Sequence, residues 1–360
     1  MGRPLSSAAV RLSALFIAGV SITCNRLPED RIVPVFFATD RGRIGYDPLD
    51  YGTGRNSPEV LQLGRIDVRI PERHTIGEVE RPNIKTLYIE HEKTHLVIRA
   101  ATEQTYEDFY SDVRRTISGS ARHEAFVFVH GFNVAFQEAV FRTAQIAWDL
   151  SFDGAAILYS WPSLGVLDTK AYRTDYNNNE WTVPHLQYFL EDVSGRTGAS
   201  KIHLIAHSMG NRALTYALNR IIADRRVQPK RFEQVVLAAA DIDASTFRGL
   251  ATVFPQSSLR TTLYASSEDL ALKFSSQIQG DSGRYRRAGD TVPDVLIVPG
   301  IDTVDATLAD TSLLGHLYYG SNRSILADIH ELVAKNTAPS DRFGVDASGK
   351  PPHEYWRMRK

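Results

Sequence analysis

The chain has 360 residues, 43% of them hydrophobic and 23% charged, and a formal net charge of −1. This length supplies enough apolar surface for one large domain or two small ones, and the balanced charge argues against a nucleic-acid-binding protein, which would need a basic excess. The single cysteine, Cys24, excludes an intrachain disulfide and a cysteine-based zinc site, and no metal-type histidine spacing occurs, so we expect no metal.

The first 24 residues are typical of an export signal. Arg3 and Arg11 form a positive region before an apolar stretch, 12–24, that ends in small residues and Cys24. Cys24 stands where a bacterial lipoprotein carries its lipidated cysteine, but Ser21 departs from that motif, so lipid anchoring and simple cleavage both stay open. An ordinary buried N-terminal segment is the alternative. We expect an exported protein that is periplasmic, membrane-anchored or secreted, with a soluble main body.

Short apolar runs alternate with helical patterns from about residue 30 onward. We expect strands at residues 33–41, 65–71, 85–90, 95–100, 125–131, 156–162, 201–207, 234–241, 261–266 and 294–300. We expect helices near 103–118, 135–150 and 180–195, after residue 208, and at 322–335. The later strands are almost wholly apolar, which is typical of a parallel sheet with helices on both faces.

This order predicts one doubly wound α/β domain over residues 25–336, with an antiparallel part at its N-terminus. The tail, 337–360, is rich in Pro and Gly, and we expect it to wrap the surface or to be disordered. The polar segment 164–180 is either a cap over a site or a solvated loop. The Asp-rich segment 300–310 lacks the ligand spacing of a calcium loop and is expected to be a structural loop.

The segment HLIAHSMGNRALTYAL, 203–218, predicts a strand, a sharp turn at Ser208 and a helix. A nucleophile elbow needs small residues two positions on either side of its serine, and Ala206 and Gly210 stand there. The helix that follows brings the Met209 N–H to the reacting oxygen. Ser208 is therefore the candidate nucleophile, although an ordinary strand-to-helix turn could carry the same five residues.

The segment FVFVHGFN, 126–133, predicts a strand that ends in His130 and Gly131. Hydrolases with an elbow place their second oxyanion donor after such a strand, so the backbone N–H of Phe132 is the candidate partner of the Met209 N–H. Gly131 would let the backbone approach the substrate closely. We interpret His130 as a brace of this loop rather than as a catalyst.

The general base should follow the nucleophile in the chain. Only His316, His330 and His353 do so. His330 lies in a helical pattern and His353 in the tail, whereas His316 lies in a loop before the last helix, next to the flexible Gly315. We therefore predict His316 as the base.

Several of these segments together resemble a bacterial esterase/lipase-like α/β-hydrolase family long catalogued as a domain of unknown function. The resemblance covers roughly residues 30–335 and rests on VPVFFATDR, HGFN, FQEAVFRTAQIAWDL, YSWPS, IAHSMGNR, AAADID and GHLYYG. It implies the α/β-hydrolase fold and a Ser-acid-His triad that uses no metal and no organic cofactor. It leaves the substrate open, because one fold hosts many chemistries.

The triad acid commonly follows the second strand after the nucleophile strand, which is the predicted strand 261–266. Glu268 and Asp269 compete there, and Asp269 fits the family pattern because it directly precedes a helix-like run. An aspartate in this place also caps helices. Asp269 is our prediction, with Asp241 and Asp302 as the alternatives.

These residues predict a serine hydrolase that cleaves small-molecule or lipid esters through an acyl-enzyme. An amidase, thioesterase or acyltransferase could use the same triad, and a non-catalytic envelope protein on a hydrolase scaffold is the alternative of another class. Trp161 either walls an acyl pocket or belongs to the core. The sequence indicates no protein partner.

Overall fold

The computed structural model describes residues 31–47, 49–57, 60–83, 88–278, 286–309, 318–350 and 353–359. The predicted export signal with Cys24 and the predicted base His316 lie outside these residues. The elbow, the loop after the strand of His130 and all three candidate acids lie within them.

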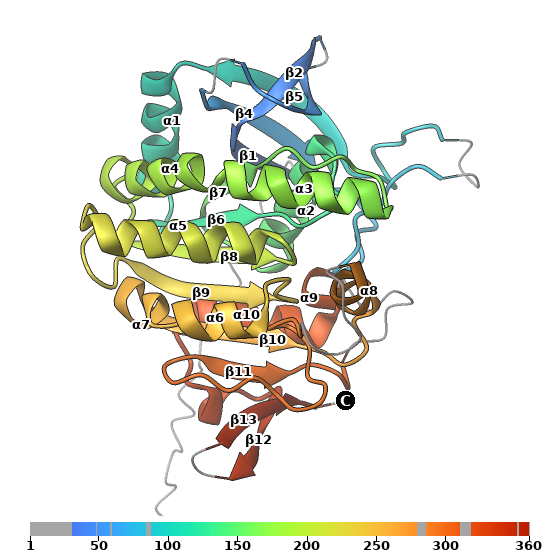
Figure 1. Cartoon of the computed structure of the whole chain (residues 1–360). Coiled ribbons are helices and arrows are strands. Elements are labelled where there is room, and N and C mark those ends of the chain that lie inside the picture. The colour runs from blue at the N-terminus through green and yellow to red at the C-terminus, as the bar shows by residue number, and fades with distance from the viewer. Residues whose placement is uncertain are drawn as a thin grey trace, which may run out of the picture.

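Parallel strands form the centre of the molecule. They are β6 (Glu124–Val129), β7 (Gly154–Ser160), β8 (Lys201–His207), β9 (Phe232–Ala238), β10 (Ser258–Ala265) and β11 (Asp302–Asp305). Neighbours pair in parallel in the order β11-β10-β9-β8-β6-β7. The carboxyl ends of these strands therefore share one edge of the sheet, on the side to which the arrowheads of β6, β8 and β9 point in Figure 1.

The N-terminal part of the sheet is antiparallel, as expected. The strand β1 (Ile32–Thr39) pairs in parallel with β7 but antiparallel with β4 (Gln62–Arg69), which in turn pairs antiparallel with β5 (Val97–Gln104). A separate hairpin consists of β2 (Arg41–Tyr46) and β3 (Leu49–Arg55). Its Tyr51 ring packs edge-on against Phe136, with ring centres 4.7 Å apart.

Alternate side chains of the central strands fill two cores, one on each face of the sheet. In β6, Ala125, Val127 and Val129 join one core, and Phe126 and Phe128 join the other. The helices that contribute to the first core are α1 (Tyr106–Gly119), α3 (Thr169–Trp181), α4 (Val183–Arg196), α5 (Gly210–Asp224), α6 (Ala244–Leu250) and α7 (Val253–Ser257).

The second core is covered mainly by α2 (Phe136–Asp149) and α10 (Arg323–Lys335), and α8 (Leu270–Ile278) adds Leu272 to it. A short helix, α9 (Tyr318–Ser321), precedes α10. Helices on both faces of a mostly parallel sheet make this the doubly wound α/β-hydrolase architecture that the sequence predicts. No helix in the described ranges is both long enough and apolar enough to cross a membrane.

The strand predicted at 294–300 is wrong, because the sheet takes up Asp302–Asp305 in its place. The apolar run lies between Pro293 and Pro299 and follows an irregular path, and its Leu296 and Val298 are buried in the first core without pairing in the sheet. The Asp-rich segment expected as a loop supplies β11 instead. The strand predicted at 85–90 is also not seen in its described part, 88–90, where Tyr88 has a φ of 57°.

Residues after 337 extend the sheet, although we expected a surface tail. They form a hairpin of β12 (Val345–Lys350) and β13 (His353–Met358), and β13 pairs in parallel with β11. Met358 is fully buried and Trp356 packs on the second core. Within the described residues the sheet therefore has eleven strands, ordered β12-β13-β11-β10-β9-β8-β6-β7-β1-β4-β5.

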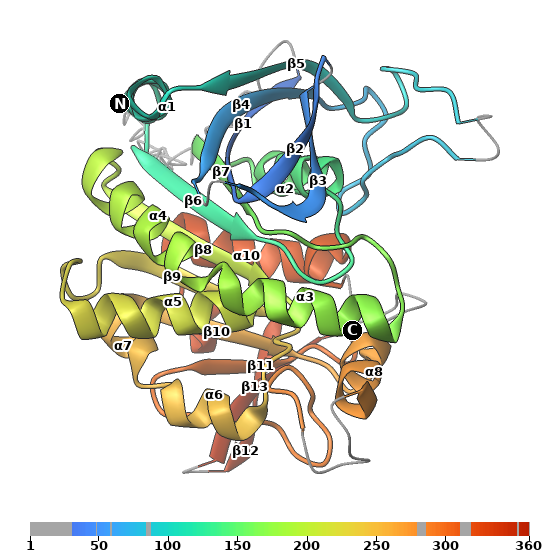
Figure 2. The same cartoon turned by 45° about the horizontal axis from the view of Figure 1, so that its top comes forward.

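The polar segment 164–180 forms most of α3, neither a free cap nor a solvated loop. Asp168 caps the helix by accepting a hydrogen bond from the Ala171 N–H, at 2.7 Å. The helix lies beside α4 and α5 on one face of the sheet (Figures 1 and 2). Its buried side chains include Tyr172, Asp175 and Asn179, which reach the candidate site.

Candidate active site

Ser208 lies at the carboxyl edge of the sheet, between the last residue of β8 and the start of α5. Its φ of 51° is left-handed, which is rare for a residue with a side chain. The Ser208 N–H donates to the Ala238 carbonyl at 3.0 Å, which ties the turn to the end of β9. A buried serine in this strained turn has the geometry of a nucleophile elbow.

Two glycines allow β6 and the elbow to come into contact. A Cβ on Gly210 would lie 2.4 Å from the carbonyl oxygen of His130, and a Cβ on Gly131 would lie 2.7 Å from the Cβ of Ser208. Neither position therefore has room for a larger residue. The predicted small residue Ala206 lies in β8 directly opposite Val129 of β6. The structure thus brings the loop that follows β6 against Ser208.

The peptide between Ser208 and Met209 is fixed through its carbonyl oxygen. The Ser208 carbonyl accepts hydrogen bonds from the Asn211 N–H, the Asn211 side-chain amide and the Asp241 N–H, each at 3.1 Å. The N–H of Met209 belongs to the same planar peptide group, so its direction is fixed as well. Asn211 and its anchoring role were not predicted from the sequence.

His130 is fully buried and directly follows β6. Its ring stacks on Trp161, with ring centres 5.1 Å apart, and its Nδ1 lies 2.8 Å from the Gly131 carbonyl oxygen. Burial, and then the charge of the neighbouring Arg41, hold the pKa of His130 well below its usual range. Trp161 is itself fully buried and donates its indole N–H to the His130 carbonyl at 2.8 Å, so it is a core residue.

Arg41 is the main feature that the sequence analysis missed. Its guanidinium is fully buried next to His130, and burial lowers the pKa of Arg41 to about 10 despite several nearby carboxylates. Its partners lie on β3, on β7 and in the loops that follow β6 and β7. The Asp-Arg pair at the end of the motif VPVFFATDR was the only available signal.

Asp175 of α3 ties the loops after β6 and β7 together. Its carboxylate accepts hydrogen bonds from the Ser163 hydroxyl at 2.6 Å and from the Leu164 N–H at 2.9 Å. Burial raises the pKa of Asp175 to about 6, although these bonds and one from the Asn133 backbone oppose the shift. The segment predicted as a cap or loop thus supports the loop that carries Phe132, whose ring packs against Tyr172 of the same helix.

The three candidate acids occupy different places. Asp269 is buried at the turn between β10 and α8, where its Oδ1 accepts the Leu272 N–H at 2.9 Å, while the neighbouring Glu268 is exposed. Asp241 is buried after β9 and is engaged by Tyr172 at 3.0 Å, by Ser275 at 2.5 Å and by Arg287 at 3.2 Å.

Asp302 lies at the amino-terminal start of β11, where it pairs with Arg260 at 2.8 Å. In the sheet it stands opposite Thr262, three residues before the end of β10 at Ala265. The carboxyl edge that carries Ser208 is therefore not the edge to which Asp302 belongs.

The described residues on either side of His316 lie next to the turn that carries Asp269. The Ser267 N–H donates to the Thr307 hydroxyl at 3.0 Å, and the Asn322 side chain donates to the Ala309 carbonyl. The chain therefore leaves the sheet beside Asp269 before the segment of His316, and it returns to nearly the same place after it. The other two histidines that follow Ser208 in the chain, His330 on α10 and His353 on β13, belong to other elements.

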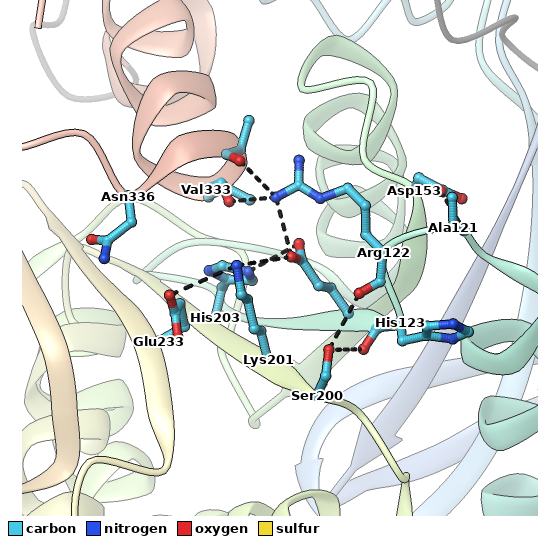
Figure 3. A network of polar contacts seen from close by, with 12 residues as sticks. Ala121, Arg122, His123, Asp153, Ser200, Lys201, His203, Glu233, Val333 and Asn336 are labelled. Carbon is cyan, nitrogen blue, oxygen red and sulfur yellow. Dashed lines mark hydrogen bonds and ion pairs between the residues drawn. The ribbon is translucent and has the colours of Figure 1, made fainter.

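A buried pair of a histidine and a carboxylate lies at the opposite edge of the sheet (Figure 3). His203 and Glu124 are both buried and lie 3.4 Å apart near the amino ends of β8 and β6. Arg122 joins this group to the end of α10 through the carbonyls of Val333, at 2.9 Å, and Ala334, at 3.0 Å. His203 lies five positions before Ser208 along the extended strand, about 16 Å away, so this pair serves the fold.

A cavity of about 1110 Å³ opens beside the turn between β10 and α8. It lies between the loop that precedes β11 and the C-terminal hairpin. Its lining includes Ser267, Thr307, Leu308, Tyr355 and Arg357 but not Ser208. Across the described part of the chain, no group of three or more His, Cys, Asp or Glu side chains is arranged to hold a metal ion.

Residues 106–335 match the model of a protein family described as alpha/beta hydrolase of unknown function (DUF900). Among solved structures, a thermostable esterase from Pseudomonas putida is similar at 12% identity and a TM-score of 0.29, over 86% of this chain and 82% of that chain. A naproxen esterase (carboxylesterase NP) from Bacillus subtilis is similar at 13% identity and a TM-score of 0.27, over 59% and 83%. Likenesses this weak say nothing about what this chain acts on.

Proposed function

We propose, from the premise that the chain belongs to the family of alpha/beta hydrolases of unknown function (DUF900), that it hydrolyses carboxylic esters with Ser208 as its nucleophile. The observation that carries the proposal is the strained turn at Ser208 pressed against Gly131. This contact puts the side chain of the serine next to the start of the loop that bears Phe132. An ester carbonyl on Ser208 would then have backbone N–H groups from two loops within reach.

The reaction begins when His316 takes the proton of the Ser208 hydroxyl and the serine oxygen attacks the ester carbonyl carbon. The N–H groups of Phe132 and Met209 donate to the oxyanion. The intermediate collapses, the bond to the alcohol oxygen breaks, and His316 returns the proton to that oxygen. A water molecule, deprotonated by His316, then attacks the acyl-enzyme, and the acid leaves as Ser208 regains its proton.

Asp269 is the proposed partner of His316 in this scheme. It would hold the imidazole in the required tautomer and stabilise the imidazolium that forms. Its burial at the carboxyl edge, on the turn that contacts Thr307 through Ser267, supports this role. Its side chain also accepts a hydrogen bond from the Leu272 N–H and so caps α8, a structural role that it can fill alongside the catalytic one.

The test replaces Ser208 with alanine. We expect Ser208→Ala to lower the turnover of short p-nitrophenyl esters by at least about 10⁴-fold, because loss of a triad nucleophile removes covalent catalysis. A fluorophosphonate probe should label the wild-type protein at Ser208 and leave the variant unlabelled. Esters should also be cleaved faster than a matched thioester and a peptide.

The matched control is Ser258→Ala. Ser258 is equally buried but begins β10 and donates to the Phe254 carbonyl at 2.9 Å. This variant should keep its turnover and its labelling. If Ser208→Ala instead keeps most of its activity while it stays folded, another group is the nucleophile and the proposal is wrong.

A further inference from the structure

The peptide between Gly131 and Phe132 carries the second oxyanion donor of the proposed mechanism, on which this inference rests. Its carbonyl oxygen lies 2.8 Å from Nδ1 of His130. A carbonyl oxygen only accepts, so Nδ1 carries the hydrogen and donates it. The peptide group is planar, and fixing its oxygen therefore also fixes the direction of the Phe132 N–H.

The same hydrogen bond determines the protonation state of Nε2, the other nitrogen of the imidazole. With its hydrogen on Nδ1 and a strongly lowered pKa, His130 is neutral and its Nε2 is an acceptor. Nη2 of Arg41 lies 3.2 Å from this nitrogen and donates to it. The hydroxyl of Ser160 is a second neighbour of Nε2, also at 3.2 Å. A line of donors therefore runs from Arg41 through His130 to the oxygen of the Gly131 peptide.

Arg41 is itself held by a full set of hydrogen bonds. Its guanidinium has five N–H bonds and five acceptors. Nε donates to the Ser160 hydroxyl at 2.9 Å, Nη1 to the Gly52 and Ser163 carbonyls, both at 3.1 Å, and Nη2 to the Val134 carbonyl at 2.7 Å and to His130. The donors to His130 and Val134 hold the turn that contains Phe132 at both of its ends.

All five acceptors of Arg41 are uncharged. Carboxylates, Asp40 and Asp175 foremost, act on it through space, and among the described residues none accepts a hydrogen bond from it. A carboxylate bonded directly to the guanidinium would offset its positive charge. As it stands, a buried positive charge lies directly behind the line of donors. Hydrogen bonds in such a line polarise one another where water is excluded.

We propose that Arg41 and His130 are positioning residues for ester hydrolysis, which orient and polarise the Gly131–Phe132 peptide as an oxyanion donor. The effect acts where charge develops, in the transition state, so it should appear in kcat and leave KM nearly unchanged. A purely structural brace would instead change the stability of the protein and both kinetic constants without a consistent pattern.

Two conservative variants of His130 separate the roles of its nitrogens. In His130→Asn the side-chain amide can replace Nδ1 and keep the bond to the Gly131 oxygen. In His130→Gln the side chain reaches the place of Nε2 and loses that bond. We expect His130→Gln to lower kcat by about tenfold to a hundredfold with little change in KM, while His130→Asn, which keeps the bond to the Gly131 oxygen but loses the contact with Arg41, retains more of the activity. Affinity for a trifluoromethyl ketone, which mimics the oxyanion, should fall in parallel.

Arg41→Lys and Arg41→Met extend the test to the guanidinium. Both should lower kcat and the affinity for the trifluoromethyl ketone, because neither side chain can hold His130 and Val134 together. Arg342→Met is the matched control, since Arg342 is an equally buried arginine paired with Asp328 on α10. It should lose stability but keep kcat.

Labelling of Ser208 by the fluorophosphonate distinguishes the possible failures. If the wild-type protein is not labelled and Ser208→Ala is as active as wild type, the proposed function fails. If Ser208 is the nucleophile but His130→Gln and His130→Asn have equal kcat values, or His130→Gln equals wild type, the inference about Arg41 and His130 is overturned.

Discussion

Two buried aspartates at the carboxyl edge of the sheet, Asp269 and Asp241, are candidates for the acid of the proposed triad. We expect Asp269→Asn to lower kcat by roughly 10³- to 10⁴-fold with little change in KM, because an amide cannot stabilise the imidazolium of His316. Asp241→Asn should act on stability instead, since it removes the charge that faces Arg287. An unpaired buried charge costs about 3 kcal/mol or more in the free energy of unfolding.

Steady-state kinetics and urea unfolding of the two variants check this assignment, with Glu268→Gln as a nearly neutral control. Glu268 is exposed and adjacent to Asp269, so it reports on charge alone. An inactive but fully stable Asp241→Asn beside an active Asp269→Asn would show that Asp241 is the acid.

Single residues differ in how far the sequence can predict them. The turn at Ser208 could be predicted because its signals are local: an apolar strand, small residues at Ala206 and Gly210, and a helical run. Arg41 could not, because its acceptors come from segments up to 122 positions away in the chain. Only the folded sheet brings those acceptors around one guanidinium, and a single sequence carries no signal of that convergence.

At the scale of elements, the error at residues 294–300 has a physical cause. Apolarity shows that a segment is buried, and a strand also needs a neighbour with free hydrogen-bonding groups. The run around Leu296 is buried, but β11 takes the place beside β10, and Thr303 of β11 donates to the Leu296 carbonyl at 2.8 Å. The predicted helices and the parallel strands around Ser208 are confirmed because both patterning and length agree there.

A histidine and an arginine together join three elements on the second face of the sheet. His74, in the loop after β4, lies between Asp149 of α2, at 2.8 Å, and Glu80 of its own loop, at 3.0 Å. Arg142 of α2 donates to the Gly320 carbonyl of α9 at 3.1 Å and to the Gly77 carbonyl at 3.2 Å. The loop, α2 and α9 therefore form one unit. Of these three, α9 directly follows the segment that contains His316.

The stability of this unit should depend on pH. Burial alone would lower the pKa of His74, but the hydrogen bonds to Asp149 and Glu80 outweigh it and raise the pKa to about 9. A raised pKa in the folded state stabilises the protein fully below the unfolded pKa of about 6.5. This stabilisation is lost as the pH rises through 9, and after allowance for solvent screening it amounts to about 1–2 kcal/mol.

Urea unfolding at pH 6 and pH 9.5 measures this contribution. The wild-type protein should lose stability between the two values, and His74→Gln should lose less. His330→Gln is the control, because within the described residues the hydrogen bond of His330 goes to the Leu150 carbonyl and not to a carboxylate. If His74→Gln has the wild-type pH dependence, His74 is not protonated between its two carboxylates.

At the scale of the whole molecule, the two edges of the parallel strands have different tasks. The elbow, the buried aspartates and the Arg41 group gather at the carboxyl edge, as ligand sites do in open α/β sheets. The charged group around Arg122 at the amino edge fixes α10 to the sheet (Figure 3). The C-terminal hairpin covers the side of β11, which would otherwise be an exposed edge strand.

The hairpin is attached through a buried ion pair, and this attachment gives the last prediction. Arg342 precedes β12, and its guanidinium lies 3.2 Å from the carboxylate of Asp328 on α10, with both side chains fully buried. Asp328 also accepts a hydrogen bond from the hydroxyl of Tyr264 on β10. Arg342→Met would leave the carboxylate of Asp328 buried without its cation, and we expect a loss of about 3–5 kcal/mol in the free energy of unfolding. The double variant with Asp328→Asn should recover part of that loss, because no charge then remains buried. Urea unfolding of both single variants and the double variant measures the coupling, and additive losses would show that the pair does not hold the hairpin to α10.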